Sequence, residues 1–223
     1  MTISIKKNKI IIFGADSDLA KSIYKIFNDK YELIGISRKA KNKKLLNIKC
    51  NFKKKNDIIK NTSKFLIKKN NINSIIILLG KFKRSMDNYN KDNSEDFLVT
   101  KNILEVVTNF LLKRKIETRI IAITSMDSII PNINSFKYSI GKSSISTLIK
   151  LYKKKYKNTK LNFVEIAPGP INTVMRKNKK ENKKNILQAD DVSKICLTLS
   201  EINLNVSFDT IKIFPKKWNY HFN

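Results

Sequence analysis

Short runs of apolar residues recur along the chain, and longer segments with helical periodicity separate them. The apolar runs predict strands at residues 9–13, 31–37, 46–50, 74–79, 119–124, 161–166 and 210–214. Helices are predicted over residues 19–28, 57–69, 95–113, 138–155 and 190–200. The runs are continuous in Ile, Leu and Val rather than alternating with polar residues, which is typical of strands covered on both faces. With the regular strand–helix alternation, this pattern predicts the α/β class: a doubly wound parallel sheet of about seven strands with helices on both faces.

Length and composition fit a single domain spanning residues 1–223. No internal repeat divides the 223 residues, and 41% of them are hydrophobic, which is enough for a sizeable core. The two cysteines, Cys50 and Cys196, are too few for a disulfide framework and favour a reducing compartment. The single histidine, His221, argues against a Ser-His-Asp triad and a histidine-based metal site, so no metal is predicted. No stretch is apolar enough for a signal peptide or a membrane span, so we expect a cytoplasmic protein without a membrane partner.

The net charge of +28 changes this picture less than its size suggests. Only five of the 46 basic residues are arginine, the side chain that binds guanine edges and phosphates in a bidentate way. The lysines are scattered along the chain together with many Asn and Ile residues, a bias that A/T-rich codons explain. We therefore expect no specific nucleic-acid partner. The alternative, a nucleic-acid-binding protein, predicts binding that weakens steeply with salt.

The first predicted strand leads into residues 14–22 (GADSDLAKS), where a strand–turn–helix unit can bind a dinucleotide pyrophosphate at the helix N-terminus. Gly14 provides the glycine needed where the backbone approaches phosphate. Asp18 and Ala20 stand where further glycines are common, and Asp18 can instead cap the helix. A plain strand–turn–helix with a capping Asp is the alternative interpretation. A P-loop is excluded because Lys21 comes too late after Gly14 and follows Ala20 instead of a glycine.

A second constellation follows the fifth predicted strand. Ser125 directly follows that strand, and Tyr138 and Lys142 are four residues apart, so they share one face of a helix. The sixth strand is followed by residues 168–173 (PGPINT). A tyrosine can donate a proton to a carbonyl, but its reference pKa is about 10. A lysine cation at ~4 Å favours the phenolate by about 4 kcal/mol at an effective dielectric of ~20, or roughly 3 pKa units, which brings the phenol near neutrality.

These three motifs, in this order, resemble those of the short-chain dehydrogenase/reductase family, and the resemblance covers nearly the whole chain. It implies a Rossmann-like domain in which Tyr138 is the acid/base, Lys142 lowers its pKa, and Ser125 orients the substrate oxygen. The implied cofactor-binding residues are Gly14, Ser17, Asp18, Leu19, Arg38, Asn51, Gly80, Tyr138, Lys142, Pro168, Gly169, Ile171 and Thr173. The family often adds a relay asparagine from the helix after the fourth strand. Asn102 is the favoured candidate, and the helical phase leaves Thr100 as the alternative.

The second strand is followed directly by Arg38 and Lys39, and no carboxylate stands there, which favours NADP(H) over NAD(H). The predicted function is therefore NADP(H)-dependent interconversion of a small carbonyl compound and its alcohol. Cations in the short segment 175–187, at Arg176, Lys177, Lys179 and Lys180, suggest an anionic substrate. The resemblance implies a homodimer or homotetramer formed through the helices at 95–113 and 138–155. The alternative function is a catalytically weak, cofactor-binding regulator or scaffold of the same fold.

Overall fold

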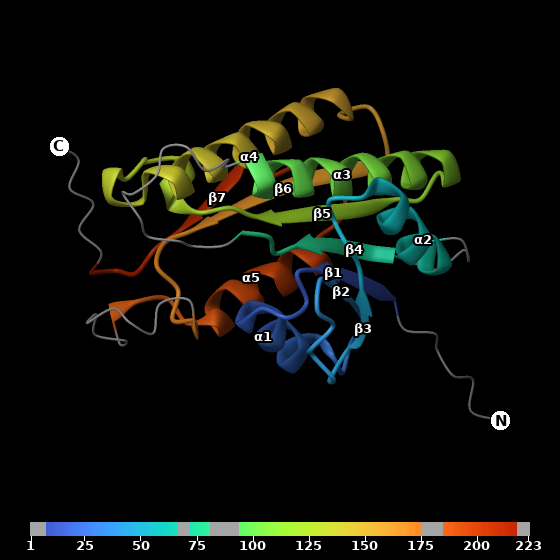
Figure 1. Cartoon of the computed structure of the whole chain (residues 1–223), viewed down its shortest axis with the longest axis horizontal. Coiled ribbons are helices and arrows are strands. Elements are labelled where there is room, and N and C mark those ends of the chain that lie inside the picture. The colour runs from blue at the N-terminus through green and yellow to red at the C-terminus, as the bar shows by residue number, and fades with distance from the viewer. Residues whose placement is uncertain (1–7, 67–71, 81–93, 175–184, 218–223) are drawn as a thin grey trace.

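The computed structural model describes residues 8–66, 72–80, 94–174 and 185–217 (Figure 1). Seven strands form one parallel sheet in the order β3-β2-β1-β4-β5-β6-β7. The strands are β1 (Lys9–Phe13), β2 (Glu32–Ser37), β3 (Leu46–Lys49), β4 (Ile72–Ile77), β5 (Thr118–Ile123), β6 (Leu161–Pro168) and β7 (Thr210–Ile213). The α-helices of the described part are α1 (Asp18–Phe27), α2 (Lys55–Leu66), α3 (Ser94–Arg114), α4 (Phe136–Lys155) and α5 (Ala189–Glu201). The doubly wound parallel sheet predicted from the sequence is confirmed, and element boundaries agree to within a few residues.

Helices cover both faces of the sheet because successive residues of the buried strands point to opposite sides. Ile10 and Ile12 of β1 face one hydrophobic cluster, which contains the buried sides of α1 and α5. Ile11 and Phe13 face the other cluster, which contains α3 and α4 and Ile58 of α2. Figure 1 shows α3 and α4 on one side of the sheet, and α1 and α5 on the other. The core is therefore split into two layers by a sheet that is apolar on both faces.

The strand order reverses between β1 and β4, which are neighbours in the sheet although β2 and β3 separate them in sequence. The connections that follow β1 and β4 therefore diverge to opposite sides, and this divergence opens a crevice at the carboxyl ends of the strands. The backbone N–H of Leu78 still donates to the carbonyl of Phe13 at 2.8 Å, so the two strands stay paired up to the edge of this crevice. The fold thus fixes where a ligand can enter the sheet.

A buried arginine ties β5 to the end of α5. Arg119 is fully buried, and its position within an apolar strand gave no sign of this role in the sequence. Its guanidinium donates to the backbone carbonyls of Leu199, Ile202, Asn203 and Val206, and its Nε donates to Oδ1 of Asn162. The guanidinium carbon also lies 5.7 Å from the ring centroid of Phe208. Carbonyls at the end of a helix lack intrahelical donors, so this one side chain pairs with carbonyls at the end of α5 and in the loop that follows it.

Candidate active site

Two adjoining cavities lie along the carboxyl ends of the strands. The first, called here the β5-side cavity, has a volume of about 640 Å³. It is lined by Asp16, Ser17, Asp18, Leu19, Lys21, Leu78, Leu79, Gly80, Ile123, Thr124, Ser125, Asp127, Asn132, Asn134, Ser135, Tyr138, Lys142, Pro168, Gly169, Pro170, Ile171, Thr173 and Val174. The second, the β2-side cavity, has about 650 Å³ and is lined by Gly14, Asp16, Ser17, Ser37, Arg38, Lys39, Lys41, Asn51, Phe52, Lys53, Leu78, Leu79, Gly80, Glu95, Asp96 and Val99. The lining residues that they share show that the two cavities meet over the point where β1 and β4 diverge.

The turn after β1 requires its glycine. Gly14 has φ +89°, and a Cβ there would lie 2.5 Å from the carbonyl oxygen of Leu78. Ser17, not Asp18, is the N-cap of α1, because its hydroxyl accepts the N–H of Ala20 at 3.1 Å. The sequence-based suggestion that Asp18 caps the helix is therefore wrong: serine is an equally good cap and comes one residue earlier.

Asp18 instead links the turn to the segment after β6. Its Oδ2 accepts the backbone N–H of Val174 at 2.7 Å, and its Oδ1 pairs with Nζ of Lys21 at 2.8 Å. Leu19 follows it and lies buried at the base of the cavity. The carboxylate thus bridges two sides of the β5-side cavity beside the N-terminus of α1.

Asp16 organises the loop that follows β2, a role that the sequence did not reveal. Its carboxylate accepts the hydroxyl of Ser37 at 2.9 Å and the amide of Asn47 at 2.9 Å. It also accepts the backbone N–H groups of Lys41 at 2.7 Å and Asn42 at 3.0 Å. Burial acts to raise the pKa of Asp16, but these hydrogen bonds outweigh it and lower the pKa below its ordinary value. An ionised carboxylate therefore holds this loop against the turn after β1.

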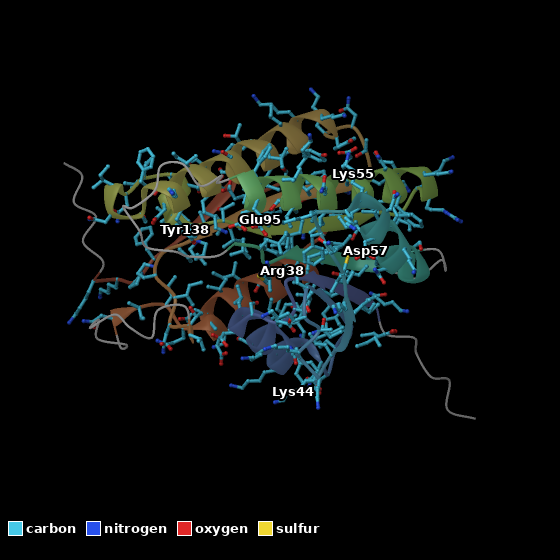
Figure 2. The ribbon with its side chains drawn as sticks, in the orientation of Figure 1. Arg38, Lys44, Lys55, Asp57, Glu95 and Tyr138 are labelled. Atoms are coloured by element: carbon cyan, nitrogen blue, oxygen red, sulfur yellow. The ribbon has the colours of Figure 1, made fainter. Side chains whose placement is uncertain are left out.

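Cations from the end of β2 and from the loop after it line the β2-side cavity: Arg38, Lys39 and Lys41. Glu95, at the start of α3, lies 3.8 Å from Arg38 and 3.5 Å from Lys53. Figure 2 labels Arg38 and Glu95. All three side chains are about half exposed, so these pairs are weak and leave the cations able to take another anionic partner.

Asn51 also lines the β2-side cavity, directly beyond β3. Its backbone N–H donates to Asp57 at 2.5 Å, and its Oδ1 accepts the N–H of Lys53 at 3.1 Å. These two bonds fix the turn between β3 and α2, and they hold Asn51 at the wall of the cavity.

The structure brings Ser125, Tyr138 and Lys142 together in the β5-side cavity. Tyr138 and Lys142 come from the first turns of α4, and the Lys142 Nζ lies 5.7 Å from the centroid of the tyrosine ring. Ser125 follows β5, where its hydroxyl accepts the N–H of Asp127 at 3.2 Å and caps the 3₁₀ turn η1 (Met126–Ser128). Figure 2 shows Tyr138 near the start of α4. A proton donor, a cation and a hydroxyl therefore share one cavity.

Lys142 reaches the end of β4 past a glycine. Its Nζ donates to the carbonyl of Leu79 at 2.7 Å and to that of Ile123 at 3.5 Å. Gly80 has φ +140°, and a Cβ there would lie 2.5 Å from this Nζ. Any other residue at position 80 would therefore meet the ammonium group as well as a strained backbone conformation.

The charge on Lys142 is buried, because the side chain is only 5% exposed. Desolvation lowers the pKa of Lys142 to about 8, although the carboxylates of Asp96, Asp127 and Glu165 act in the opposite direction. The ammonium form still dominates at neutral pH, yet proton exchange lies within reach of neutral pH. This combination suits a group that supports general acid–base chemistry.

Glu165 is one of these supporting carboxylates, and the sequence gave no hint of it because it lies within the buried strand β6. Its Oε1 accepts the hydroxyl of Thr124 at 2.6 Å, and its Oε2 accepts those of Ser146 at 3.0 Å and Thr210 at 2.9 Å. Thr124 precedes Ser125, and Ser146 lies one helical turn after Lys142. A single buried carboxylate thus connects the strand and the helix that carry the candidate catalytic side chains.

The two relay candidates do not line either cavity. The amide of Asn102 donates to the backbone carbonyls of Phe52 at 3.1 Å and Lys53 at 3.2 Å, which ties α3 to the loop after β3. The hydroxyl of Thr100 donates to the carbonyl of Asp96 at 2.7 Å within its own helix. A relay role for Asn102 therefore remains a prediction.

The remaining predicted cofactor residues come from the end of β6. Pro168 ends the strand, and the N–H of Gly169 donates to the carbonyl of Ile213 at 2.7 Å. Ile171 pairs with Leu187, which holds this connection along the cavity up to Thr173. The basic residues of segment 175–184, from which an anionic substrate was inferred, lie outside the described residues.

Within the described ranges, no group of three or more His, Cys, Asp or Glu side chains is placed to hold a metal ion. No helix of this part of the chain is long and apolar enough to cross a membrane.

Comparison with known proteins identifies the family to which this chain belongs. The family model described as short chain dehydrogenase matches residues 15–184. Among curated proteins, no match was found. An alcohol dehydrogenase from the archaeon Thermococcus sibiricus, complexed with 5-hydroxy-NADP, superposes with a TM-score of 0.80 at 15% identity, over 97% of this chain and 100% of that chain.

Two further solved structures show the same fold at comparable similarity. A 3-ketoacyl-(acyl-carrier-protein) reductase from Brucella melitensis, complexed with NADH, gives a TM-score of 0.76 at 14% identity, over 94% of this chain and 97% of that chain. A short-chain type dehydrogenase/reductase from Mycobacterium ulcerans gives 0.80 at 11% identity, over 93% and 88%. The structural likeness establishes the fold, and the family match spans most of the sequence. The chain therefore belongs to the short-chain dehydrogenase family of oxidoreductases.

Proposed function

We propose that this protein interconverts a small carbonyl compound and its alcohol with NADP(H) as the cofactor. The observation that carries the proposal is the convergence of Ser125, Tyr138 and Lys142 in one cavity that continues over the β1–β4 crevice. When bound, a nicotinamide cofactor supplies or accepts the hydride. The protein must then position the substrate and move the proton.

The two cavities together form a groove whose lining residues fit a dinucleotide. Gly14 lets the backbone of the turn approach a ligand closely, and the capped N-terminus of α1 presents N–H groups and a positive dipole end to a pyrophosphate. On the β2 side, Asn51 and Arg38 border the space for an adenosine ribose and base. On the β5 side, Ile171 and Thr173 border the space for the nicotinamide half.

In the proposed reduction, the Tyr138 hydroxyl donates its proton to the carbonyl oxygen as that oxygen becomes an alkoxide. The Lys142 ammonium stabilises the resulting phenolate, and burial strengthens this interaction because the local dielectric is low. Ser125 donates a second hydrogen bond to the same oxygen. The oxidation direction uses the same groups with the proton moving from the alcohol to the phenolate.

Replacement of Tyr138 tests the proposal. Tyr138→Phe removes the proton donor while keeping the ring, so turnover on any accepted carbonyl should fall by at least 10²-fold, the lower end of general acid catalysis. Tyr152→Phe, on the same helix, is the matched control and should retain turnover. Both rates are followed by NADPH oxidation across a broad panel of aldehydes and ketones. Unchanged turnover in Tyr138→Phe would contradict the assignment.

A preference for NADP(H) over NAD(H) is supported by Arg38, Lys39 and Lys41, which can pair with a ribose 2′-phosphate. Titration of the protein with NADPH and NADH, followed by nicotinamide fluorescence, should give the lower Kd for NADPH. Arg38→Glu should reduce or reverse that preference. Equal affinities for the two cofactors would refute it.

A catalytically weak, cofactor-binding scaffold is the second candidate. The contact that favours it is the bond from Val174 to Asp18, because it places a carboxylate beside the position proposed for the pyrophosphate. Like charges repel, so Asp18 would weaken cofactor binding. Asp18→Gly should then lower the Kd for NADPH. Turnover of any carbonyl by the wild-type protein would exclude this second candidate.

We also propose that the protein forms a homodimer through α3 and α4. Exposed apolar side chains on and beside these helices include Leu98, Ile133, Phe136, Ile140 and Leu151. Most of them border a hollow of about 710 Å³ on the α4 face. A patch of this kind marks a protein interface. Light scattering should give twice the chain mass for the wild type and the single chain mass for Ile140→Glu.

A further inference from the structure

One wall of the β5-side cavity carries a carboxylate that neither the sequence motifs nor the proposed reaction uses. Asp127 lies two residues after Ser125, within the 3₁₀ turn η1. Its Oδ2 accepts the hydroxyl of Ser135 at 2.5 Å, and its backbone N–H donates to the hydroxyl of Ser125 at 3.2 Å. Both serines line the same cavity, so Asp127 is fixed beside the proposed reacting groups.

The wall around Asp127 is polar and holds no cation among the described residues. Asn132 and Asn134 complete it together with Ser135. The N–H of Asn134 donates to Oδ1 of Asn132 at 2.9 Å, and the hydroxyl of Ser139 accepts the N–H of Asn132 at 3.0 Å. These bonds within the loop make the wall preorganised rather than adaptable.

The two lysines that line this cavity, Lys21 and Lys142, have partners other than Asp127. Lys21 pairs with Asp18 at 2.8 Å. Lys142 donates to the carbonyl of Leu79, and in the proposed reaction it serves Tyr138. The described wall beside the reacting groups therefore presents an acceptor-only group, Asp127. Its charge acts on Lys142, whose pKa it raises, but it forms no ion pair with a cation of the described residues.

From this placement, and resting on the proposed function, we infer that Asp127 is a specificity-determining residue. The substrate that the protein prefers is then a carbonyl compound with a hydrogen-bond donor next to the carbonyl carbon. This donor is a protonated amine or a hydroxyl group. A carboxylate rewards such a donor and repels an anionic group at the same position, since a partly desolvated charge pair interacts strongly. The inference opposes the anionic substrate suggested by the basic residues of segment 175–184.

Four small ketones of similar size separate the possibilities: butanone, hydroxyacetone, aminoacetone and pyruvate. At slightly acidic pH, where the amine is protonated, kcat/KM of the wild type should be at least tenfold higher for a donor-bearing ketone than for butanone, and lowest for pyruvate. Asp127→Asn should collapse the ratio between that ketone and butanone by at least tenfold. If Asp127→Asn lowers the ratio to butanone only for aminoacetone, Asp127 recognises an ammonium group. If it lowers the ratio for both aminoacetone and hydroxyacetone, Asp127 recognises any hydrogen-bond donor. Asp29→Asn, an exposed substitution of the same kind, should leave all ratios unchanged.

A binding measurement gives an answer that does not depend on turnover. Calorimetric titration of the NADP⁺-loaded protein with 1-amino-2-propanol, 1,2-propanediol, 2-butanol and lactate should show tighter binding of a donor-bearing alcohol. Asp127→Asn should weaken that binding by at least tenfold, while its melting temperature and its Kd for NADPH report that the fold is intact. Equal or better performance of butanone and pyruvate would overturn the inference and leave the proposed reaction standing. Failure of every ligand in both measurements would overturn it as well. Loss of the proposed function itself would appear separately, as no turnover of any carbonyl in the broad panel.

Discussion

Folding removes the charge of Lys142 from water. The variant Lys142→Met measures how much this desolvation lowers the free energy of unfolding. In the folded protein the pKa of Lys142 falls from the ordinary value of 10.5 to about 8 because of desolvation. At ~1.4 kcal/mol per pKa unit, this difference corresponds to about 3 kcal/mol of lost stability while both states are protonated. Methionine fills a similar volume without charge. It also leaves the Leu79 carbonyl without its donor, which costs about 1 kcal/mol.

Lys142→Met should therefore be more stable than the wild type at pH 7, by about 2 kcal/mol. Below pH 8 both folded and unfolded chains hold the proton, so the cost is fully present. Between pH 8 and 10.5 the unfolded chain binds the proton more strongly than the folded one, so wild-type stability rises with pH relative to the variant. Above 10.5 both states are neutral and the advantage of the variant disappears.

Urea denaturation of both proteins at a series of pH values between 7 and 10.5 provides the assay. The difference in free energy of unfolding between the two proteins isolates Lys142 from the other titrating lysines and tyrosines. Lys150→Met, at an exposed position of the same helix, is the control and should show no such pH dependence. A variant that is less stable than the wild type at pH 7, or a difference that stays constant with pH, would refute the reasoning.

Three further predictions concern side chains that act away from the cavity centre. Arg119→Met should destabilise the protein by about 3 kcal/mol, because it removes a buried guanidinium that donates to the buried carbonyl of Leu199 and to the part-buried carbonyls of Ile202 and Asn203; a urea midpoint close to that of the wild type would contradict this. Glu165→Gln removes a charge that raises the pKa of Lys142. The pH above which NADPH binding weakens, measured as Kd against pH, should therefore be lower in this variant. An unchanged pH limit would contradict the prediction. Asn102→Ala breaks the tie to the loop after β3 and should lower the melting temperature with kcat nearly kept; the opposite pattern, a large loss of kcat at constant melting temperature, would identify Asn102 as the relay residue.

Most of the fold was predictable because the buried strands are continuous apolar runs. Strands such as β1 and β5 can be recognised from a few neighbouring residues, and their parallel arrangement follows from the strand–helix alternation. The pairing of Tyr138 with Lys142 was equally predictable, because spacing along a helix is a local property. Boundaries were less exact: β4 begins at Ile72 and ends at Ile77, two residues before the predicted limits.

The polar groups that support the site could not be predicted in this way. Asp16, Glu165 and Arg119 each take hydrogen-bond partners from segments far away in the sequence, and no local pattern encodes such partners. Glu165 interrupts an apolar run and Arg119 stands at the start of one, so neither residue carries more than an isolated polar signal. The position of Asn102 could not be predicted for a different reason. Helical phase indicates the direction of its side chain, but it does not indicate which neighbouring loop the amide contacts.

The hydrogen bond from Val174 to Asp18 has a thermodynamic consequence for ligand binding. It joins the turn after β1 to the chain beyond β6, so the two sides of the groove are energetically linked. A dinucleotide whose phosphates displace the Asp18 carboxylate would release Val174, and a substrate that draws Val174 away would free the N-terminus of α1. Since coupling between two sites is reciprocal, each ligand would raise the affinity for the other by the same factor. Cooperative binding of cofactor and substrate would then be a property of one carboxylate rather than of the whole fold.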